Sequence, residues 1–89
     1  MEQALILGKL SNRVPRDLIQ NIKKIKSVIH ANLIYGPYDF YAVVNTETKE
    51  MLSDTVLQIR SYEGVQDTMT CYAIELSDIR PEAKGPYVE

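Results

Sequence analysis

The chain of 89 residues contains no tryptophan, a single cysteine (Cys71) and a single histidine (His30). One cysteine cannot form an internal disulfide, which favours a reducing compartment such as the cytoplasm. One cysteine and one histidine cannot build a structural zinc site. Domains of this size are often stabilised by disulfides, metals or oligomerisation. Oligomerisation is therefore the leading candidate for the extra stabilisation that a domain of this size often needs.

An excess of basic residues is also missing. Lys and Arg number 10 against 12 Asp and Glu, the net charge is −2 and the pI is about 5.4. Nucleic-acid-binding proteins usually carry a basic face and a high pI, and the short cluster of Lys23, Lys24 and Lys26 is typical of a solvated helix face. No apolar run approaches the length of a membrane span, and no basic region precedes the first apolar stretch as in a signal peptide. We therefore expect a complete small cytoplasmic protein that binds neither DNA nor membranes directly.

The apolar residues that are present alternate between strand and helix patterns. Short runs rich in β-branched residues predict strands, and Leu18, Ile22 and Ile25 recur at the spacing of one helix face. The predicted strands are residues 4–10, 28–35, 40–44 and 65–76, and the predicted helices are residues 15–26 and a segment capped by Thr46 or Thr48 that ends before Gly64. The polar residues 77–89 predict a C-terminal tail.

An internal repeat supports this order. Residues 22–28 map onto residues 59–65 at a constant shift of 37 positions. Two equal β-α-β units joined by a hairpin make a ferredoxin-like βαββαβ sandwich of the α+β class. In this fold two helices cover one face of a four-stranded antiparallel sheet.

The second face of that sheet is predicted to be unusually apolar. A sheet with one wet face should alternate apolar and polar residues, yet the first strand places Leu5 and Leu7 on the side away from Ile6, and the third places Tyr41 and Val43 there. An exposed apolar face of this kind indicates an interaction surface, so we expect a homo-oligomer that begins as a two-fold dimer. An error in the assigned strand parity is the alternative explanation.

The segment Gly36-Pro37-Tyr38-Asp39 is the most distinctive local feature. It is typical of a hairpin turn, in which glycine supplies an unusual backbone angle and proline stiffens the chain. A turn can also bind a ligand: backbone N–H groups of Gly36 and Tyr38 can hold a carboxylate, Asp39 can accept an ammonium group and Tyr38 can wall the site. That chemistry suits a zwitterionic amino acid.

Other candidate residues carry weaker signals, and no metal, phosphate-binding or nucleophile motif is present. Thr68 and Thr70 share one face of a strand, which fits strand propensity or a pair of hydroxyls that line a polar site. Cys71 is predicted to be a buried, inert thiol. His30 is predicted to be a packed or surface residue rather than a ligand or base. No cofactor is indicated.

Taken together, these motifs resemble the Lrp/AsnC ligand-binding domain, also called the RAM domain. The resemblance runs from Ala4 to Glu75. The matching motifs are the segment from Ile22 to Val28, Gly36-x-Tyr38-Asp39, Gly64-Val65 and Thr68-x-Thr70. It implies the same βαββαβ fold and no catalysis. It also implies dimerisation through the sheets, assembly into octamers or decamers, and amino-acid effectors bound between dimers.

The family resemblance implies a ligand site at Gly36, Tyr38, Asp39, Thr68 and Thr70. Full-length members of the family are transcription regulators with an N-terminal helix-turn-helix domain, whereas this sequence begins in its first strand. We therefore expect a stand-alone effector domain at residues 1–76, with a tail at residues 77–89. A full-length Lrp/AsnC regulator is a further candidate partner.

Two other function classes stay open from the sequence. A small enzyme of the dimeric α+β barrel type, monooxygenase-like or isomerase-like, shares the fold, and His30, Tyr41 and Asp39 would be its candidate residues. Such an enzyme would place His30 in a deep closed pocket. A purely structural partner of a DNA-binding paralogue is the third class.

Overall fold

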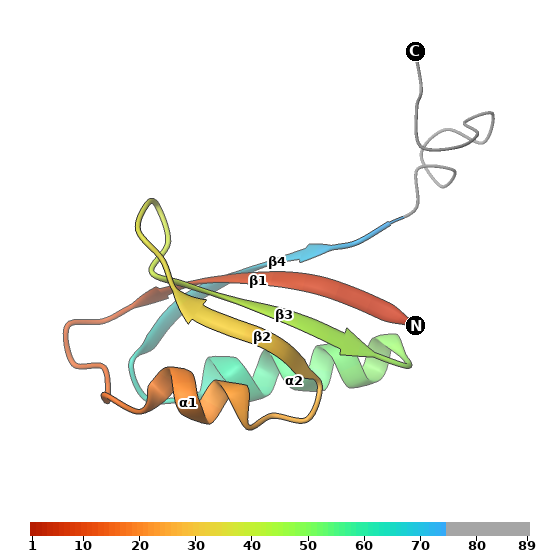
Figure 1. Ribbon diagram of the computed structural model, residues 1–89, viewed down its shortest axis with the longest axis horizontal. Coiled ribbons are helices and arrows are strands. Elements are labelled where there is room, and N and C mark those ends of the chain that lie inside the picture. Colours follow the sequence, from red (N-terminus) through yellow and green to blue (C-terminus); the bar gives the residue numbers. More distant parts are fainter. Residues whose placement is uncertain (75–89) are drawn as a thin grey trace, which may run out of the picture.

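The computed structural model describes residues 1–74 and contains four strands and two helices (Figure 1). Their bounds are β1 (Glu2–Leu10), α1 (Leu18–Lys23), β2 (Val28–Leu33), β3 (Phe40–Thr46), α2 (Lys49–Ser61) and β4 (Val65–Tyr72). The predicted order β-α-β-β-α-β and the α+β ferredoxin-like fold are confirmed. The predicted tail at residues 77–89 lies outside the described residues. Neither helix within residues 1–74 has the length and apolar character needed to cross a bilayer.

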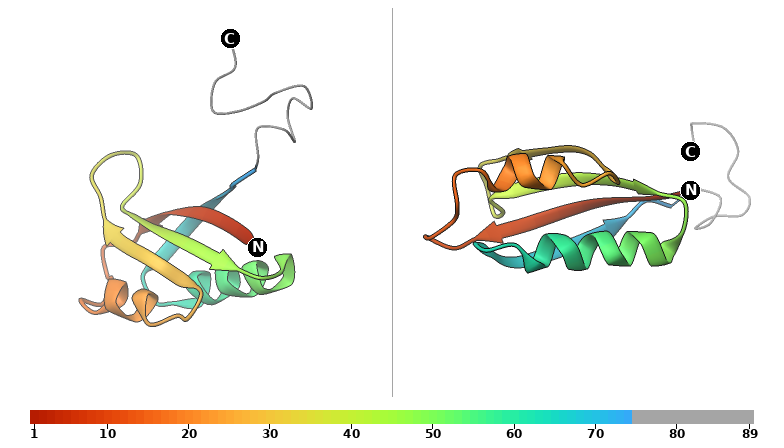
Figure 2. Two further views of the ribbon diagram at one scale, coloured as in Figure 1. Left: turned by 45° about the vertical axis from the view of Figure 1, so that its right-hand side comes forward. Right: turned by 90° about the horizontal axis from the view of Figure 1, so that it is seen from below.

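The sheet has the strand order β2-β3-β1-β4, and all three neighbouring pairs are antiparallel. Strand β1 therefore lies between β3 and β4. Both helices lie side by side on one face of the sheet (Figure 2). Helix α1 contacts β2, whereas α2 contacts β1, β3 and β4.

Helix α1 is shorter than the predicted segment 15–26. Pro15 precedes it in a turn in which the Leu18 amide donates to the Pro15 carbonyl at 3.2 Å. After Lys23 the chain continues in tight turns, with i to i+3 bonds from Ile25 to Ile22 and from Val28 to Ile25 at 3.1 and 3.0 Å. Apolar residues keep helical spacing through such turns, so the spacing alone predicts a helix that is too long.

Helix α2 begins and ends at specific signals. Thr48 is its N-cap, and the Thr48 hydroxyl oxygen accepts a hydrogen bond from the Met51 amide at 3.1 Å. Gly64 follows the helix with a φ of +93°, and a Cβ at Gly64 would lie 2.8 Å from the Val14 Cα. Both the backbone angle and the close approach require glycine.

The core fills the space between the helices and the sheet. The largest fully buried side chains are Phe40, Ile6, Ile22, Leu52, Ile59 and Val44. The ring of Phe40 occupies the position that a Cβ on Gly8 would take, so the glycine in β1 makes room for the aromatic ring on β3. The buried positions alternate along β1 and β3 as the predicted parity requires.

The opposite face of the sheet, which we call the open face, is not covered by any element within residues 1–74 (Figure 2). Its apolar members include Leu5, which is 38% exposed, Val43, which is half-buried, and Met69, which is 48% exposed. Cys71 pairs with Leu5 and is exposed on this face. The prediction that Cys71 is buried is therefore wrong, because Cys71 points to the open face, away from the helices.

Candidate functional site

The loop between β2 and β3 is a closed hairpin turn, as the sequence predicts. The Ile34 amide donates to the Asp39 carbonyl at 2.9 Å across the base of the loop. Gly36 has a φ of +135°, and a Cβ there would meet no atom within 4 Å. The backbone angle rather than crowding therefore requires glycine at this position.

Asp39 anchors this loop to the end of β1. Its amide donates to the Gly8 carbonyl at 2.8 Å, and its carboxylate Oδ2 accepts from the Leu10 amide at 2.8 Å. Both bonds lie on the side of β1 that faces β3. The β1–β3 pairing ends at Gly8 and Phe40, and the carboxylate supplies a partner for the Leu10 amide just beyond that last pair. Oδ1 of the same carboxylate takes no part in this bond.

A hollow of about 480 Å³ borders the loop on the side of Asp39. It is lined by Leu10, Ser11, Asn12, Leu33, Ile34, Tyr35 and Asp39. One wall of the hollow is therefore apolar. Asp39 adds an anionic residue to the lining of the hollow. A small molecule that combines an ammonium group with an apolar side chain matches these two kinds of lining.

Tyr38 points to a different place, across the open face of the sheet. Its hydroxyl lies 3.5 Å from the Met69 Sδ, and the Lys9 Nζ lies 5.9 Å from the centroid of its ring. Both neighbours belong to the open face, where Met69 pairs with Leu7. Tyr38 thus links the loop to the open face and does not line the hollow beside Asp39.

The threonine pair lies on the other side of the sheet. Thr68 pairs with Gly8 and Thr70 pairs with Ile6, which is a buried residue beneath the helices. The two threonines share one face as predicted, but that face is opposite to the one on which Tyr38 contacts Met69. Within one subunit the structure brings Gly36, Tyr38 and Asp39 together in one loop and leaves the threonines apart from Tyr38.

His30 and Tyr41 form a pair on the open face. The His30 Nδ1 and the Tyr41 hydroxyl lie 2.6 Å apart, and the rings stack at 5.5 Å between centroids with an interplanar angle of 18°. His30 belongs to β2 and Tyr41 to the neighbouring β3. The His30 side chain is exposed. His30 does not line the hollow beside Asp39. The deep closed pocket that would favour an enzyme is not found around His30 in the described part of one subunit.

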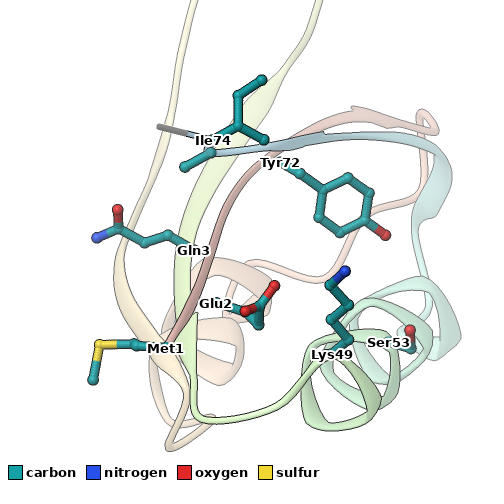
Figure 3. A pocket seen from close by; sticks show the side chains of 8 residues that line it. Met1, Glu2, Gln3, Lys49, Ser53, Tyr72 and Ile74 are labelled. Carbon is teal, nitrogen blue, oxygen red and sulfur yellow. The ribbon is translucent and has the colours of Figure 1, made fainter. Parts of the chain in front are cut away.

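A larger hollow, of about 720 Å³, lies at the opposite end of the sheet. It is lined by Met1, Glu2, Gln3, Lys49, Ser53, Tyr72, Ala73 and Ile74. Figure 3 shows Lys49 and Ser53 of α2 reaching toward Tyr72 of β4, with Glu2 of β1 beside them. No motif in the sequence predicts this hollow, because its residues come from three separate elements.

Comparison with solved structures identifies the relatives of this fold. The crystal structure of TTHA0845 from Thermus thermophilus is 36% identical, with a TM-score of 0.76, and the match covers 84% of this chain and 95% of that one. The chain belongs to the Lrp/AsnC family. It corresponds to the RAM domain of that family, as the sequence resemblance implies. FFRP-DM1 matches at 29% identity and a TM-score of 0.76 over 83% of this chain and all of that one.

Larger Lrp/AsnC proteins share the fold at lower identity. The transcriptional regulator NMB0573 from Neisseria meningitidis, solved with L-Met, is 20% identical with a TM-score of 0.71, and the match covers 84% of this chain. The chain spans 51% of that regulator's length. No protein-family model and no curated protein sequence matches the chain.

Proposed function

We propose that this protein is an effector-binding module that binds an amino acid or a similar small metabolite between subunits and modulates transcription or amino-acid metabolism through its assembly. The observation that carries the proposal is the hollow beside Asp39, which joins an apolar wall to a carboxylate. Two related proteins of this fold were solved with L-methionine: the Neisseria regulator, and a feast or famine regulatory protein of Mycobacterium tuberculosis at 18% identity and a TM-score of 0.71.

The proposed ligand contacts follow from the chemistry of the loop. The Oδ1 of Asp39, which takes no part in the bond to Leu10, accepts the ammonium group. Gly36 and Tyr38 belong to the same loop but lie outside the lining of the hollow, so their backbone N–H groups hold the carboxylate only if the ligand extends past Tyr35 along the loop. The apolar side chain of the ligand lies against Leu33 and Ile34. Asp39 also accepts a hydrogen bond from the Leu10 amide, so its side chain is held in place before the ligand arrives. The side chain therefore loses less conformational entropy when the ligand binds.

Thr68 and Thr70 fit this site only in an oligomer. In one subunit they lie on the face opposite to the contact between Tyr38 and Met69. We therefore place the threonine hydroxyls of an adjoining subunit in the proposed site. Single subunits then bind the effector weakly, and assembly and binding support each other.

The first step of assembly in this proposal is a dimer through the open face. Leu5, Val43 and Met69 expose apolar surface there, and the Tyr38 ring extends the same surface. Fully burying an aliphatic side chain contributes about 1.5–3 kcal/mol, and the sum over the open face has to exceed the roughly 4–15 kcal/mol that association loses in translational and rotational freedom. Dimers then combine into rings of octamer or decamer size.

A thermal-shift screen tests the effector proposal. The protein is heated with each of the common amino acids at millimolar concentration, because a ligand that binds only the folded state raises the melting temperature. At least one amino acid should stabilise the protein by several degrees, and native mass spectrometry should show it bound to an oligomer. A screen without a single stabiliser would contradict the proposal.

Co-purification, added to the same screen, tests the class of purely structural partner. A purely structural partner of a DNA-binding paralogue would co-purify with that regulator and respond to no amino acid. The solved relatives that carry a functional description are regulators, which supports a role without catalysis.

A further inference from the structure

A third hollow, of about 530 Å³, lies where the turn after α1, the end of β3 and helix α2 meet. Lys26 and Ser27 line it from the turn, and Met51 and Asp54 line it from α2. The hollow shares no lining residue with the hollow beside Asp39. It is therefore separate from the proposed effector site, and we call it the interhelical hollow.

The hydroxyl groups that line the interhelical hollow have committed their protons within the protein. The Thr46 hydroxyl donates to the Thr48 carbonyl at 2.8 Å, and the Thr55 hydroxyl donates to the Met51 carbonyl at 3.0 Å. The hydroxyls of Ser27 and Thr55 lie 2.6 Å apart. A hydroxyl carries one proton, and that of Thr55 is already used, so Ser27 is the donor in this contact. All three hydroxyl oxygens can then only accept a further hydrogen bond.

The other polar side chains of the lining add to this excess of acceptors. Glu47 and Asp54 are exposed carboxylates, which accept hydrogen bonds and donate none. Asn45 also belongs to the lining, and its buried Oδ1 has no hydrogen-bond partner among the described residues. Lys26 is the cationic side chain of the lining. The lining side chains therefore carry two negative charges against one positive, and their acceptors outnumber their donors.

We propose that the interhelical hollow binds a primary alkylammonium compound. An ammonium group combines a positive charge with three N–H donors. These match the carboxylates of Asp54 and Glu47 and the acceptor oxygen of Ser27, and charge-assisted hydrogen bonds of this kind are strong. The alkyl chain lies against Met51, which is 47% exposed, and against Ile25. A few polar groups beside apolar walls are typical of small-molecule sites.

Lys26 determines what the far end of the ligand can carry. Its ammonium group repels a second cation and attracts a carboxylate. Among probes with similar carbon chains, γ-aminobutyrate should therefore bind more tightly than n-butylamine, and n-butylamine more tightly than the diamine putrescine. Butyrate, which has no ammonium group, should not bind.

Titration of the full chain with n-butylamine tests the site. Amide chemical shifts in an NMR titration locate the binding, and isothermal titration calorimetry gives the dissociation constant. The amides of Ser27, Asp54 and Thr55 should shift, whereas those of Ile34 and Asp39 should not. Butyltrimethylammonium has the same charge and chain but no N–H donor. It should bind about tenfold more weakly or less, because the charge-assisted hydrogen bonds are lost.

Matched variants make the test specific to the interhelical hollow. Asp54→Asn should weaken n-butylamine binding by about tenfold, since it removes one charged acceptor. Glu50→Gln is the control, because it removes the same charge from an exposed position on the same helix but lies outside the lining. It should leave the dissociation constant unchanged. Lys26→Met should abolish the preference for γ-aminobutyrate over putrescine.

Four outcomes overturn the proposal. These are no saturable binding of n-butylamine, equal affinity for butyltrimethylammonium, equal losses in Asp54→Asn and Glu50→Gln, or binding that shifts Ile34 and is lost in Asp39→Asn. The last result would assign the ammonium group to the hollow beside Asp39 instead. A failed amino-acid screen with n-butylamine binding intact would contradict the effector function alone.

Discussion

The carboxylate of Asp39 accepts a hydrogen bond from the backbone amide of Leu10 at 2.8 Å. This bond joins the loop that carries the proposed ligand contacts to the end of the central strand β1. One oxygen of Asp39 is therefore structural and the other is available for a ligand. Substitutions at this position should affect stability and binding to different extents, and the two effects can be separated.

Replacing Asp39 with Asn should keep most of the stability and lose most of the effector binding. The amide oxygen still accepts from the Leu10 N–H, but the negative charge that the proposed ammonium group needs is gone. Asp39→Ala should in addition lower the free energy of unfolding by about 1 kcal/mol, because the hydrogen bond is lost. Urea denaturation and amino-acid titration measure the two quantities. An Asp39→Asn variant that binds as tightly as the unaltered protein would remove Asp39 from the site.

Cys71 reports on the open face, because it is the single cysteine and lies exposed beside Leu5. A thiol reagent should modify it quickly in dilute protein and at least tenfold more slowly at concentrations where the proposed dimer forms. The control is Leu5→Asp, which places a charge on the open face and should make the labelling rate independent of concentration. Equal rates at all concentrations of the unaltered protein would argue against a dimer through this face.

Gly8→Ala should destabilise the protein by about 1–3 kcal/mol, because overpacking forces a neighbouring side chain or the backbone to move. The ring of Phe40 already occupies the position of the new methyl group. The double variant Gly8→Ala/Phe40→Leu should recover part of the loss relative to the sum of the single changes. Thermal unfolding of the four proteins completes the cycle, and strictly additive losses would mean that the two residues do not compete for space.

The hydroxyls of Ser27 and Thr55 lie 2.6 Å apart, and Thr55 is buried. Thr55→Val removes one partner and should cost about 1–3 kcal/mol, since the Ser27 hydroxyl then lacks its partner. The double variant Ser27→Ala/Thr55→Val should be more stable than that single variant. Chemical denaturation gives the coupling free energy, and a value near zero would show that the pair contributes nothing.

Local patterns in the sequence predict much of this fold because they have local causes. The alternation of Leu5, Ile6 and Leu7 follows from the two-residue period of a strand, and it predicts an apolar second face that the structure has. Gly36 and Pro37 predict the hairpin because each acts on its own backbone angles, which is again a local cause. The cap at Thr48 depends on a bond to a residue three positions away.

Features that depend on partners distant in the sequence were not predictable in the same way. The separation of Thr68 from Tyr38 depends on the register between β1 and β4, and a slip of one residue would reverse it. The exposure of Cys71 depends on the register that pairs it with Leu5 on the open face. The bond from Leu10 to Asp39 spans 29 positions, and no short motif encodes it.

The central position of β1 has a consequence for folding. Of these four strands β1 is synthesised first, so it is hydrogen-bonded on both sides only after the segments that contain Val44 and Tyr72, the partners of Ala4, have been made. Contacts between residues so distant in sequence give a high contact order, which slows folding relative to a helical bundle of equal length. During translation the apolar strand Glu2–Leu10 is therefore a segment that chaperones can bind.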